Sequence, residues 1–248
     1  TILASGGNHN IGGTGYTYNY LNQGHTLQNE GQLQISSTGS GQKSLYITGS
    51  SNGVAASRLV NKGEMTLAAD ANTAVYFYRN GGNADAALDN SGKLTKNGVG
   101  LASISTQFNN TGNVVLNDGI LALEGGSSHS SASGISGNGT LRLGSGTHSF
   151  ADGFVNHAGL TQLQNGTLQG VAGSSLNFLG SLEGSGGTIR DAALLQVANA
   201  KLSGTTIKDV AEARLAKAEL TGVTLSGNGK TILASGGNHN IGGTGYTY

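Results

Sequence analysis

The sequence contains no cysteine, no proline and no tryptophan, and only 10% of its residues are charged. Without cysteine the chain forms no disulfide bond and no thiolate metal site, which is compatible with any compartment. Its 13 basic and 13 acidic side chains cancel. The chain therefore lacks the electrostatic footprint of a protein that binds nucleic acid or an anionic membrane surface. No apolar run approaches the length of a membrane span, so we expect no membrane insertion in this segment.

Glycine is abundant, with 44 residues, yet the composition is not that of a disordered chain. Disordered segments usually combine high net charge with few apolar residues. Here the net charge is zero, and 36% of the residues are hydrophobic. These apolar residues are also regularly spaced, which predicts a folded core.

One long segment occurs twice without a change. The letters TILASGGNHNIGGTGYTY stand at 1–18 and again at 231–248. A chance match of this length is not realistic, and a fixed internal period is the signature of repeat architectures. We interpret residues 1–230 as one unit of a tandem array and residues 231–248 as the start of the next unit. An artificial duplication is the alternative.

A second and much shorter period is visible near the C-terminus. The segment GGTIRDAALLQVANAKLS (186–203) aligns with GTTIKDVAEARLAKAELT (204–221). The matching pairs are Thr188 and Thr206, Ile189 and Ile207, Arg190 and Lys208, Asp191 and Asp209, and Leu202 and Leu220. When the next segment is aligned in the same way, Leu233 matches Val197 and Leu215. Within each aligned segment, residues predicted to face inward and outward alternate, which is the signal of a β-strand.

One segment also permits a helix. VAEARLAKAEL (210–220) consists largely of strong helix formers. Its column match to AALLQVANAKL (192–202), whose Val and Asn suit a helix less well, predicts that both copies adopt the same strand-turn-strand course.

Turns that contain Asn and Gly recur along the rest of the chain, each followed by a short alternating run. They occur in QNEGQLQI, VNKGEMTL, LDNSGKLT, FNNTGNVVL and QNGTLQG. Asn and Gly adopt the left-handed backbone conformations of tight turns at little steric cost. The pattern predicts an all-β fold in which residues 1–248 form a single β-solenoid, a parallel β-helix. Each coil takes roughly 18–20 or more residues with loop insertions, and stacked Asn side chains can form hydrogen-bonded ladders.

These dimensions predict the size of the unit. At about twenty residues per coil, residues 1–230 make eleven or twelve coils. At about 4.8 Å per coil, the unit advances some 55 Å along the axis. We expect the adjacent repeats of the same chain to cover the strand edges that are exposed at the two ends.

The same turns, together with SLEGSGGTI (181–189) and SGISGNGTLRL (133–143), carry a family resemblance. The chain resembles the filamentous-haemagglutinin and autotransporter-passenger class of secreted bacterial proteins. This resemblance implies a right-handed parallel β-helix that lies outside the cell or on the bacterial surface. It also implies an adhesive or structural rod.

Motifs for cofactors and metals are absent from the sequence. The stretch GNGKT (227–231) resembles the end of a phosphate-binding loop, but the first glycine of that motif should fall at position 224, which is Thr. Calcium-binding nonapeptides are also missing. The six histidines lack metal-ligand spacing, and we expect most of them in exposed loops. They are His9, His25, His129, His148, His157 and His239. We predict no cofactor and no metal.

Acidic residues recur one coil apart at Asp191 and Asp209, about 5 Å from each other if the strands stack. Some β-helices cleave polysaccharides with paired carboxylates. Because Arg190 and Lys208 recur beside them, we favour a solvated ladder of alternating charges over a catalytic dyad.

Tyrosines recur at strand spacing in two places and are the best surface candidates. They are Tyr16, Tyr18 and Tyr20 in the first stretch and Tyr76 and Tyr78 in the second. An inward set would be core packing. An outward set would stack on sugars or seal contacts between rods, because Tyr has a large apolar body and a polar tip.

These observations favour a non-catalytic extracellular rod built from tandem units. A surface filament or sheath that assembles laterally is the alternative, with neighbouring rods or surface carbohydrate as partners. A carbohydrate-active β-helix is a weaker candidate, because acidic residues are sparse.

Overall fold

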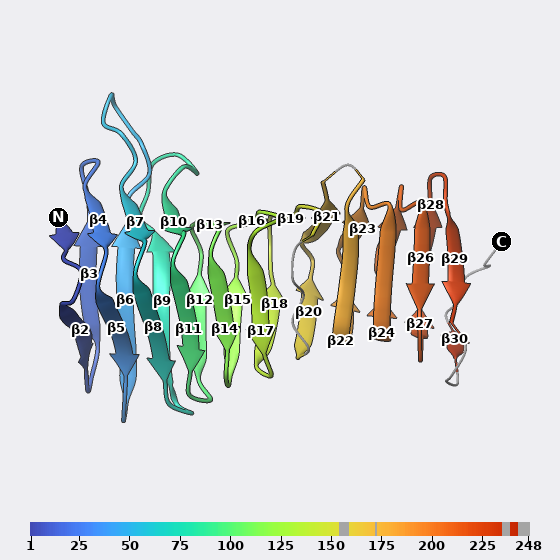
Figure 1. The fold of residues 1–248 in the computed structure, drawn as a ribbon, viewed down its shortest axis with the longest axis horizontal. Coiled ribbons are helices and arrows are strands. Elements are labelled where there is room, and N and C mark those ends of the chain that lie inside the picture. The colour runs from blue at the N-terminus through green and yellow to red at the C-terminus, as the bar shows by residue number, and fades with distance from the viewer. Residues whose placement is uncertain (154–158, 172, 235–238, 243–248) are drawn as a thin grey trace.

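The chain forms one continuous solenoid (Figure 1). The computed structural model describes residues 1–153, 159–171, 173–234 and 239–242. All strand pairs in this part of the chain are parallel, and no helix is present in it, hence none that could cross a membrane. The strands of successive coils lie on three faces, here called A, B and C. This confirms the predicted all-β solenoid.

Each face is a ladder of strands from successive coils. Face A consists of β1 (Ile2–Leu3), β4 (Thr26–Asn29), β7 (Arg58–Asn61), β10 (Ala87–Asn90), β13 (Gln107–Asn110), β16 (Ser127–His129), β19 (Thr147–Phe150), β21 (Thr167–Gly170), β23 (Thr188–Arg190), β25 (Thr206–Lys208) and β28 (Thr224–Ser226). Face B begins with β2 (Asn8–Gly13), β5 (Gln32–Ser37), β8 (Glu64–Ala69), β11 (Lys93–Asn97), β14 (Asn113–Leu116) and β17 (Gly134–Gly137). Face C begins with β3 (Thr17–Leu21), β6 (Gly41–Ile47), β9 (Thr73–Arg79), β12 (Leu101–Ile104), β15 (Ile120–Leu123), β18 (Thr140–Leu143) and β20 (Leu160–Gln164).

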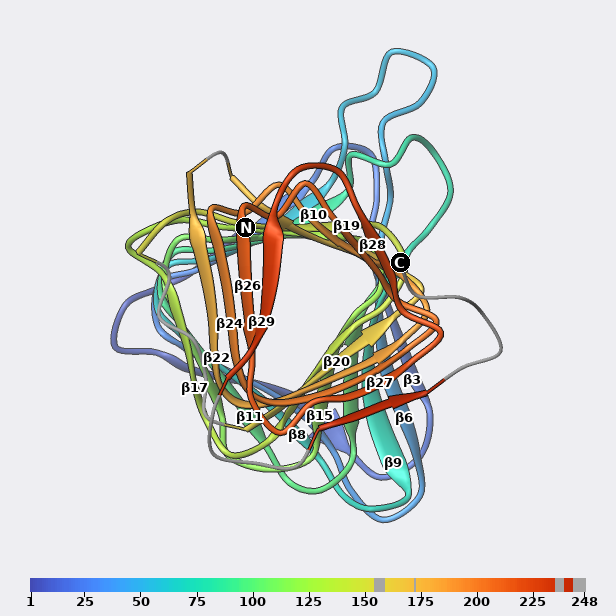
Figure 2. The same cartoon turned by 90° about the vertical axis from the view of Figure 1, so that its right-hand side faces the viewer.

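In the last coils, single strands run across the corner between faces B and C. These are β22 (Ser175–Ser185) and β24 (Leu194–Ser203). Their first parts pair with each other and continue to β26 (Glu212–Leu215) and β29 (Lys230–Leu233) in the same sheet. These two strands directly follow strands of face A in the chain and take the place of face B, on the side opposite β3, β6 and β9 (Figure 2). Their second parts continue from β20 to β27 (Glu219–Thr221) and β30 (Asn240–Gly242) on face C. Between β17 and β22, face B has no described strand, an interval that contains the undescribed residues 154–158.

Coil length falls along the chain. Asn29 pairs in register with Asn61, 32 positions later, whereas Ser181 pairs with Asn199, 18 positions later. The predicted columns of the shorter period are confirmed through to the pair Leu215 and Leu233. Longer coils carry loops between β6 and β7 and between β9 and β10, which project from the corner between faces C and A (Figure 2). Face A holds eleven strands, in agreement with the lower predicted number of coils.

The core is filled by inward side chains stacked in columns. One column on face A runs from Leu59 and Leu88 to Phe108, and resumes at Leu168 and Ile189. All five side chains have 0% exposure. Each coil buries apolar surface only against its neighbours, so the stability of the fold comes from continuous stacking.

A second inward column on face A is polar. It consists of Asn29, Asn61, Asn90 and Asn110, none more than 1% exposed. The Nδ2 of each donates to the Oδ1 of the next, over 2.7 Å, 2.7 Å and 2.8 Å. Three of these Nδ2 groups also donate to backbone carbonyls, as from Asn61 to Lys93 over 3.0 Å. This confirms the predicted asparagine ladder, whose bonds offset the loss of water around four buried amides.

Glycines stack two residues after each asparagine, where the chain turns from face A to face B. They are Gly31, Gly63, Gly92 and Gly112. A Cβ added to Gly92 would collide with the carbonyl oxygen of Gly63 and lie 2.7 Å from the carbonyl carbon of Lys62. The Asn-x-Gly turn is therefore required by close backbone contact between coils.

We expect Gly92→Ala to lower the free energy of unfolding by about 3 kcal/mol, because backbone must move to admit the methyl group. Gly144→Ala is the control, since its Cβ would meet only the flexible carboxylate of Glu124. Urea denaturation compares the two variants. If both variants lost the same free energy of unfolding, the close backbone contact at Gly92 would not be the cause.

The segment with helix-forming composition is not helical. Its residues form β26 and β27, paired with β24 in the predicted register. Ala213 and Leu215 point into the core at 1% and 0% exposure, while Arg214 between them is exposed. The strand-turn-strand prediction is confirmed, because pairing with the neighbouring coil outweighs a weak local preference.

The two identical segments at 1–18 and 231–248 lie on different faces. Ile2 and Leu3 belong to β1 and pair with β4 on face A. Ile232 and Leu233 belong to β29 and pair with β26 on face B. The second copy therefore begins one face later in its coil than the first. The tandem array itself stays a prediction, and residues 235–238 and 243–248 lie outside the described part of the chain.

Candidate functional site

The five predicted tyrosines lie on the outside of the solenoid, at face C of the first three coils. Tyr16, Tyr18 and Tyr20 are 67%, 51% and 56% exposed, and Tyr76 and Tyr78 are half-buried. Strand alternation turns their neighbours inward, as at Phe77, which has 0% exposure. Core packing, one of the two sequence interpretations, therefore does not apply to these side chains.

Tyr46 completes this group and was missed by sequence reasoning. It lies on β6 in register with Tyr20 of β3 and Tyr78 of β9. The coils that separate these three residues are much longer than the short period near the C-terminus, so the column is not visible in the sequence. We call six residues the tyrosine surface: Tyr16, Tyr18, Tyr20, Tyr46, Tyr76 and Tyr78.

Four rings of the tyrosine surface form one continuous stack in the order Tyr20, Tyr46, Tyr78, Tyr76. Their centroids are 4.9 Å, 5.3 Å and 5.0 Å apart, with planes inclined by 14°, 30° and 10°. Tyr18 leans against Tyr46 at 6.3 Å and 43°. Each inner ring stacks on two neighbours. The terminal rings, Tyr20 and Tyr76, each stack on one neighbour.

The rings also close over the sheet beneath them. Ser44 lies in register between Tyr18 and Tyr76, yet it is only 1% exposed. Burial raises the pKa of the Tyr78 phenol, and its neighbours Tyr76, Tyr46 and Tyr18 add to that rise. The Tyr78 hydroxyl group is therefore neutral at physiological pH.

A groove of ≈ 400 Å³ adjoins the tyrosine surface at the corner between faces B and C. Its walls include Tyr16 and Tyr76, with the amides of Gln42 and Asn72. Leu101 and Ile120 line it from outward positions of β12 and β15. Among the described residues that line it, none is charged.

The four residues of the predicted charge ladder lie at the ends of β23 and β25 on face A. Arg190 pairs in register with Lys208 on the next coil. Each Asp neutralises the cation that precedes it, with 3.1 Å from Arg190 to Asp191 and 3.9 Å from Lys208 to Asp209. Both Asp residues have left-handed backbone conformations at turns, with φ of 58° and 52°. The geometry is that of turn residues with partly exposed ion pairs, which contribute little to stability.

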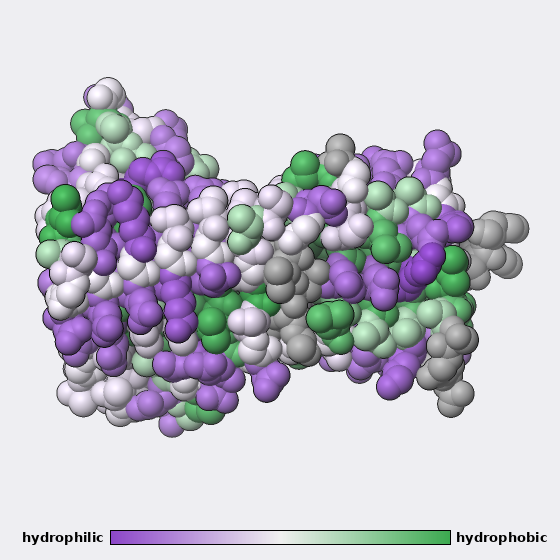
Figure 3. Space-filling view, in the orientation of Figure 1, coloured by the Kyte–Doolittle hydropathy of each residue, from purple (hydrophilic) through white to green (hydrophobic). Residues whose placement is uncertain are grey.

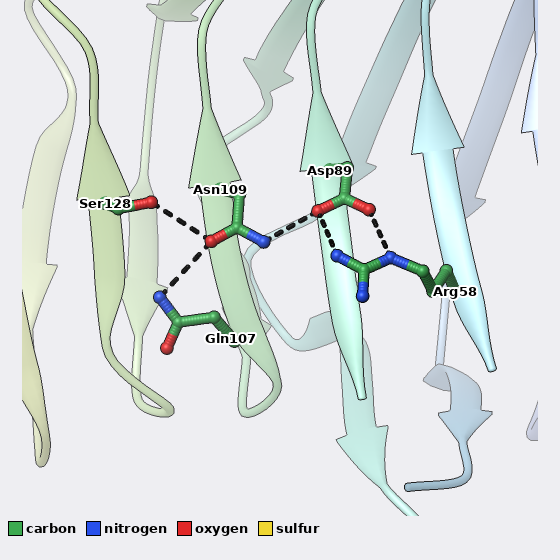
Figure 4. A network of polar contacts seen from close by, with 5 residues as sticks. All are labelled: Arg58, Asp89, Gln107, Asn109 and Ser128. Carbon is green, nitrogen blue, oxygen red and sulfur yellow. Dashed lines mark hydrogen bonds and ion pairs between the residues drawn. The ribbon is translucent and has the colours of Figure 1, made fainter. Parts of the chain in front are cut away.

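A larger polar network crosses the outer side of face A in the longer coils (Figure 4). Arg58 binds the Asp89 carboxylate with two hydrogen bonds of 2.6 Å and 2.9 Å. Asn109 donates to Asp89 over 2.7 Å and accepts from Ser128 over 3.0 Å. The bidentate bond to Asp89 raises the pKa of the Arg58 guanidinium. The network links four coils and leaves the carboxylate saturated with donors, so it fits a structural role.

Two histidines that were expected in exposed loops are instead buried. His129 is 3% exposed and His148 is 0% exposed, so the expectation is wrong for both. They occupy inward positions of face A, where His129 stacks on Phe150 with ring centroids 4.4 Å apart. Burial lowers the pKa of His129 to about 3 and that of His148 to about 4, so both rings are neutral at pH 7. His157 lies outside the described residues.

These histidines extend the asparagine ladder. Asn110 Nδ2 lies 3.5 Å from His129 Nδ1, and His129 Nε2 lies 3.0 Å from Ser127 Oγ. Ser127 Oγ lies 2.9 Å from His148 Nδ1, whose Nε2 lies 3.3 Å from the Gly144 carbonyl oxygen. Since a carbonyl only accepts, His148 carries its proton on Nε2, and Ser127 donates to Nδ1. All donors then point the same way along the chain of bonds. Because Ser127 is only 1% exposed, this Ser-His pair cannot meet a substrate.

Two lysines are also buried, a feature that sequence reasoning missed. Lys43 and Lys96 are 1% and 0% exposed. Lys43 Nζ donates to the Gly15 carbonyl over 2.6 Å, and Lys96 Nζ donates to the carbonyls of Asn97 and Gly98, the latter over 2.5 Å. Each ammonium group caps the carbonyls of the turn between faces B and C. Burial lowers the pKa of Lys96 to about 8.

We expect the free energy of unfolding to rise between about pH 8 and pH 10.5. In this window unfolded Lys96, with its ordinary pKa of 10.5, binds more protons than the folded form, so folding gains as the proton is lost. Lys96→Met should remove about 1 to 3 kcal/mol of this rise. Lys93→Met, an exposed position on the same strand, should retain it. Denaturation at pH 7, 8, 9 and 10 measures the free energy of unfolding of each protein. If it rose with pH equally in Lys96→Met and in the wild type, Lys96 would not be the source of the rise.

Nothing among the described residues provides a metal site or a phosphate-binding loop. No group of three or more His, Asp or Glu converges there. Lys230 of the GNGKT stretch lies in β29, where its Nζ pairs with Glu212 over 2.6 Å. Lys230 and Arg214 lower the pKa of the Glu212 carboxyl through their hydrogen bonds. A strand in place of a loop and helix gives the phosphate motif no structural support.

The outer sides of the coils differ in hydropathy along the axis. The side seen in Figure 3 is hydrophilic over β5, β8 and β11, and it carries apolar patches over the later coils. Leu179 of β22, one of the later strands, is a large apolar side chain with 60% exposure. The tyrosine surface and its groove remain the best candidate for a contact site, because they combine exposed aromatic rings with a concave shape.

No family model, no characterised protein and no solved structure matches the chain.

Proposed function

We propose that the chain is a non-catalytic structural or adhesive rod that acts outside the cell or on a bacterial surface. It is one unit of a tandem array, with the adjacent repeats of the same chain as its end-to-end partners. The family resemblance to filamentous haemagglutinins and autotransporter passengers points in the same direction. The neutral charge and the absence of reactive cysteine suit a mechanical spacer.

The observation that carries this proposal is the uninterrupted parallel ladder of face A, which runs through eleven strands from β1 to β28. Its core is one contiguous cluster from Leu33 to Leu220. A fold that stacks in one direction gives rigid extension, and its length grows with each added coil. The buried asparagine ladder supports the same role, because directional hydrogen bonds hold successive coils in one register.

Electron microscopy of the native, uncut material tests the rod. Ten strand spacings separate β1 from β28, so a unit advances about 50 Å at about 4.8 Å per coil. We expect thin fibres with an axial repeat near that value. Compact particles without an axial repeat would reject the array.

A second candidate is lateral assembly of rods through the tyrosine surface, whose rings point outward from β3, β6 and β9. The apolar body and polar tip of tyrosine allow such a surface to pack against its own copy in a two-fold contact. The rings also repeat at the spacing of the coils, which a neighbouring rod shares.

We expect Tyr18→Ser combined with Tyr20→Ser to abolish lateral association and leave folding intact, because both side chains point outward. Sedimentation velocity and circular dichroism measure the two effects. Since the chain has no native cysteine, Tyr46→Cys gives a further readout. Mild oxidation should yield cross-linked dimers with Tyr46→Cys and none with Asn109→Cys on face A. Equal cross-linking of the two variants would reject face C as the contact.

A further inference from the structure

We propose that the groove beside Tyr76 binds a neutral oligosaccharide, with Tyr76 as the platform on which one sugar ring stacks. This inference deepens the adhesive part of the proposed function and rests on it for its biological meaning. The groove itself is a property of the first five coils.

The first step is the state of the Tyr76 ring. Tyr76 ends the stack of four rings, so Tyr78 covers one of its faces at 5.0 Å. Its side chain also lines the groove. The inner rings Tyr46 and Tyr78 each stack on two neighbours, and neither is among the residues that line the groove. The stack fixes the ring of Tyr76 and reduces the entropy lost when a ligand stacks on it.

The second step is the chemistry of the walls. A sugar ring presents C–H groups on its faces and hydroxyl groups around its edge. Tyr16 and Tyr76 supply aromatic surface for the first, and the amides of Gln42 and Asn72 supply donors and acceptors for the second. Since no described lining residue is charged, the groove offers nothing to bind a phosphate, a sulfate or a uronic acid. The ligand is therefore a neutral sugar.

The third step is the length of the groove. Gln42, Ala74, Leu101 and Ile120 follow one another in register on β6, β9, β12 and β15. With Tyr16 in the first coil, the lining residues span five coils, which is about 19 Å along the axis at about 4.8 Å per coil. An open groove of this length suits a linear oligosaccharide better than a single sugar.

A titration with maltohexaose, cellohexaose, xylohexaose and chitohexaose tests the proposal. Because the chain lacks tryptophan, its fluorescence comes from its eight tyrosines, four of which form the stack. We expect at least one of the four to bind, and calorimetry should give one site per chain. Tyr76→Ala should weaken binding at least tenfold, and Gln42→Ala several-fold. Tyr76→Phe, which keeps the ring, should bind like the wild type.

Tyr20→Ala is the matched control. Tyr20 is the other terminal ring of the same stack, but it does not line the groove, so its removal should leave the affinity unchanged. The proposal is overturned if none of the four sugars binds at millimolar concentration, or if Tyr76→Ala and Tyr20→Ala weaken binding equally. Neither result affects the rod, which is tested by the axial repeat of the fibres. Compact particles that still bind sugar would reject the array and leave the groove in place.

Discussion

The free energy of unfolding should fall steeply between about pH 6.5 and pH 4. In the folded chain, burial lowers the pKa of His129 to about 3, with a contribution from neighbouring His148, and lowers the pKa of His148 to about 4. Unfolded histidines titrate near 6.5, so in this window the unfolded state binds more protons and is favoured as the pH falls. Each histidine contributes up to about 1.4 kcal/mol per pH unit, and the pair up to about 2.7 kcal/mol.

Urea denaturation at intervals of half a pH unit measures this slope. The control is the combined variant Ser127→Ala, His129→Phe and His148→Leu. It replaces the two imidazoles by residue types that already occupy their columns at Phe150 and Leu168, and it removes the hydroxyl that lies between them. Carboxylates titrate equally in both proteins, so the difference between the two slopes isolates the histidines. Identical slopes would mean that the rings are not held neutral in the fold.

Asn90→Ala should lower the free energy of unfolding by about 4 kcal/mol, because it breaks the middle of the asparagine ladder. Asn90 accepts from Asn61 over 2.7 Å and donates to Asn110 over 2.8 Å. Removing the amide leaves one buried N–H of Asn61, whose other N–H still donates to the Lys93 carbonyl, and the buried Oδ1 of Asn110 without these partners. Each such group costs about 1 to 3 kcal/mol, and the cavity adds to the loss.

Asn109→Ala is the matched control for the ladder. Asn109 is the neighbour of Asn110 on β13, but it points outward into the network of Figure 4 and is partly exposed. Water can replace its bonds, so we expect a loss of about 1 kcal/mol or less. Denaturation curves for both variants decide the matter. If Asn109→Ala lowered the free energy of unfolding as much as Asn90→Ala, the ladder would not contribute more to stability than the outer network.

Much of the fold could be predicted because two signals repeat with the coil. Side-chain alternation marks the strands, and Asn-x-Gly turns mark the corner after face A. The short-period columns from Thr188 to Thr224 appear directly in the pairing of β23, β25 and β28. Where loops enlarge the coils, as between β6 and β9, the column is lost from the sequence although it persists in space. This is why Tyr46 was not grouped with Tyr78.

The buried polar groups could not be predicted, for a different reason. The alternation that indicates which side chains point inward relies on a contrast between apolar and polar residues. In SSHSS (127–131) every residue is polar, so the sequence does not show which of them face the core. Only the pairing of β16 with β13 and β19 turns Ser127 and His129 inward. Lys43 and Lys96 were hidden in the same way, since each replaces an apolar residue in a core column.

The sequence by itself determined the strand, the turn and the stacking period, because these depend on residues close together in the chain. Tertiary structure alone decided which face each strand joins. The repeated segment demonstrates the distinction, since Ile2 and Leu3 lie on face A whereas Ile232 and Leu233 lie on face B. Identical residues have identical local preferences, but a strand pairs with whichever neighbour the preceding coil presents. The position of the chain on that coil, not its own letters, sets the face.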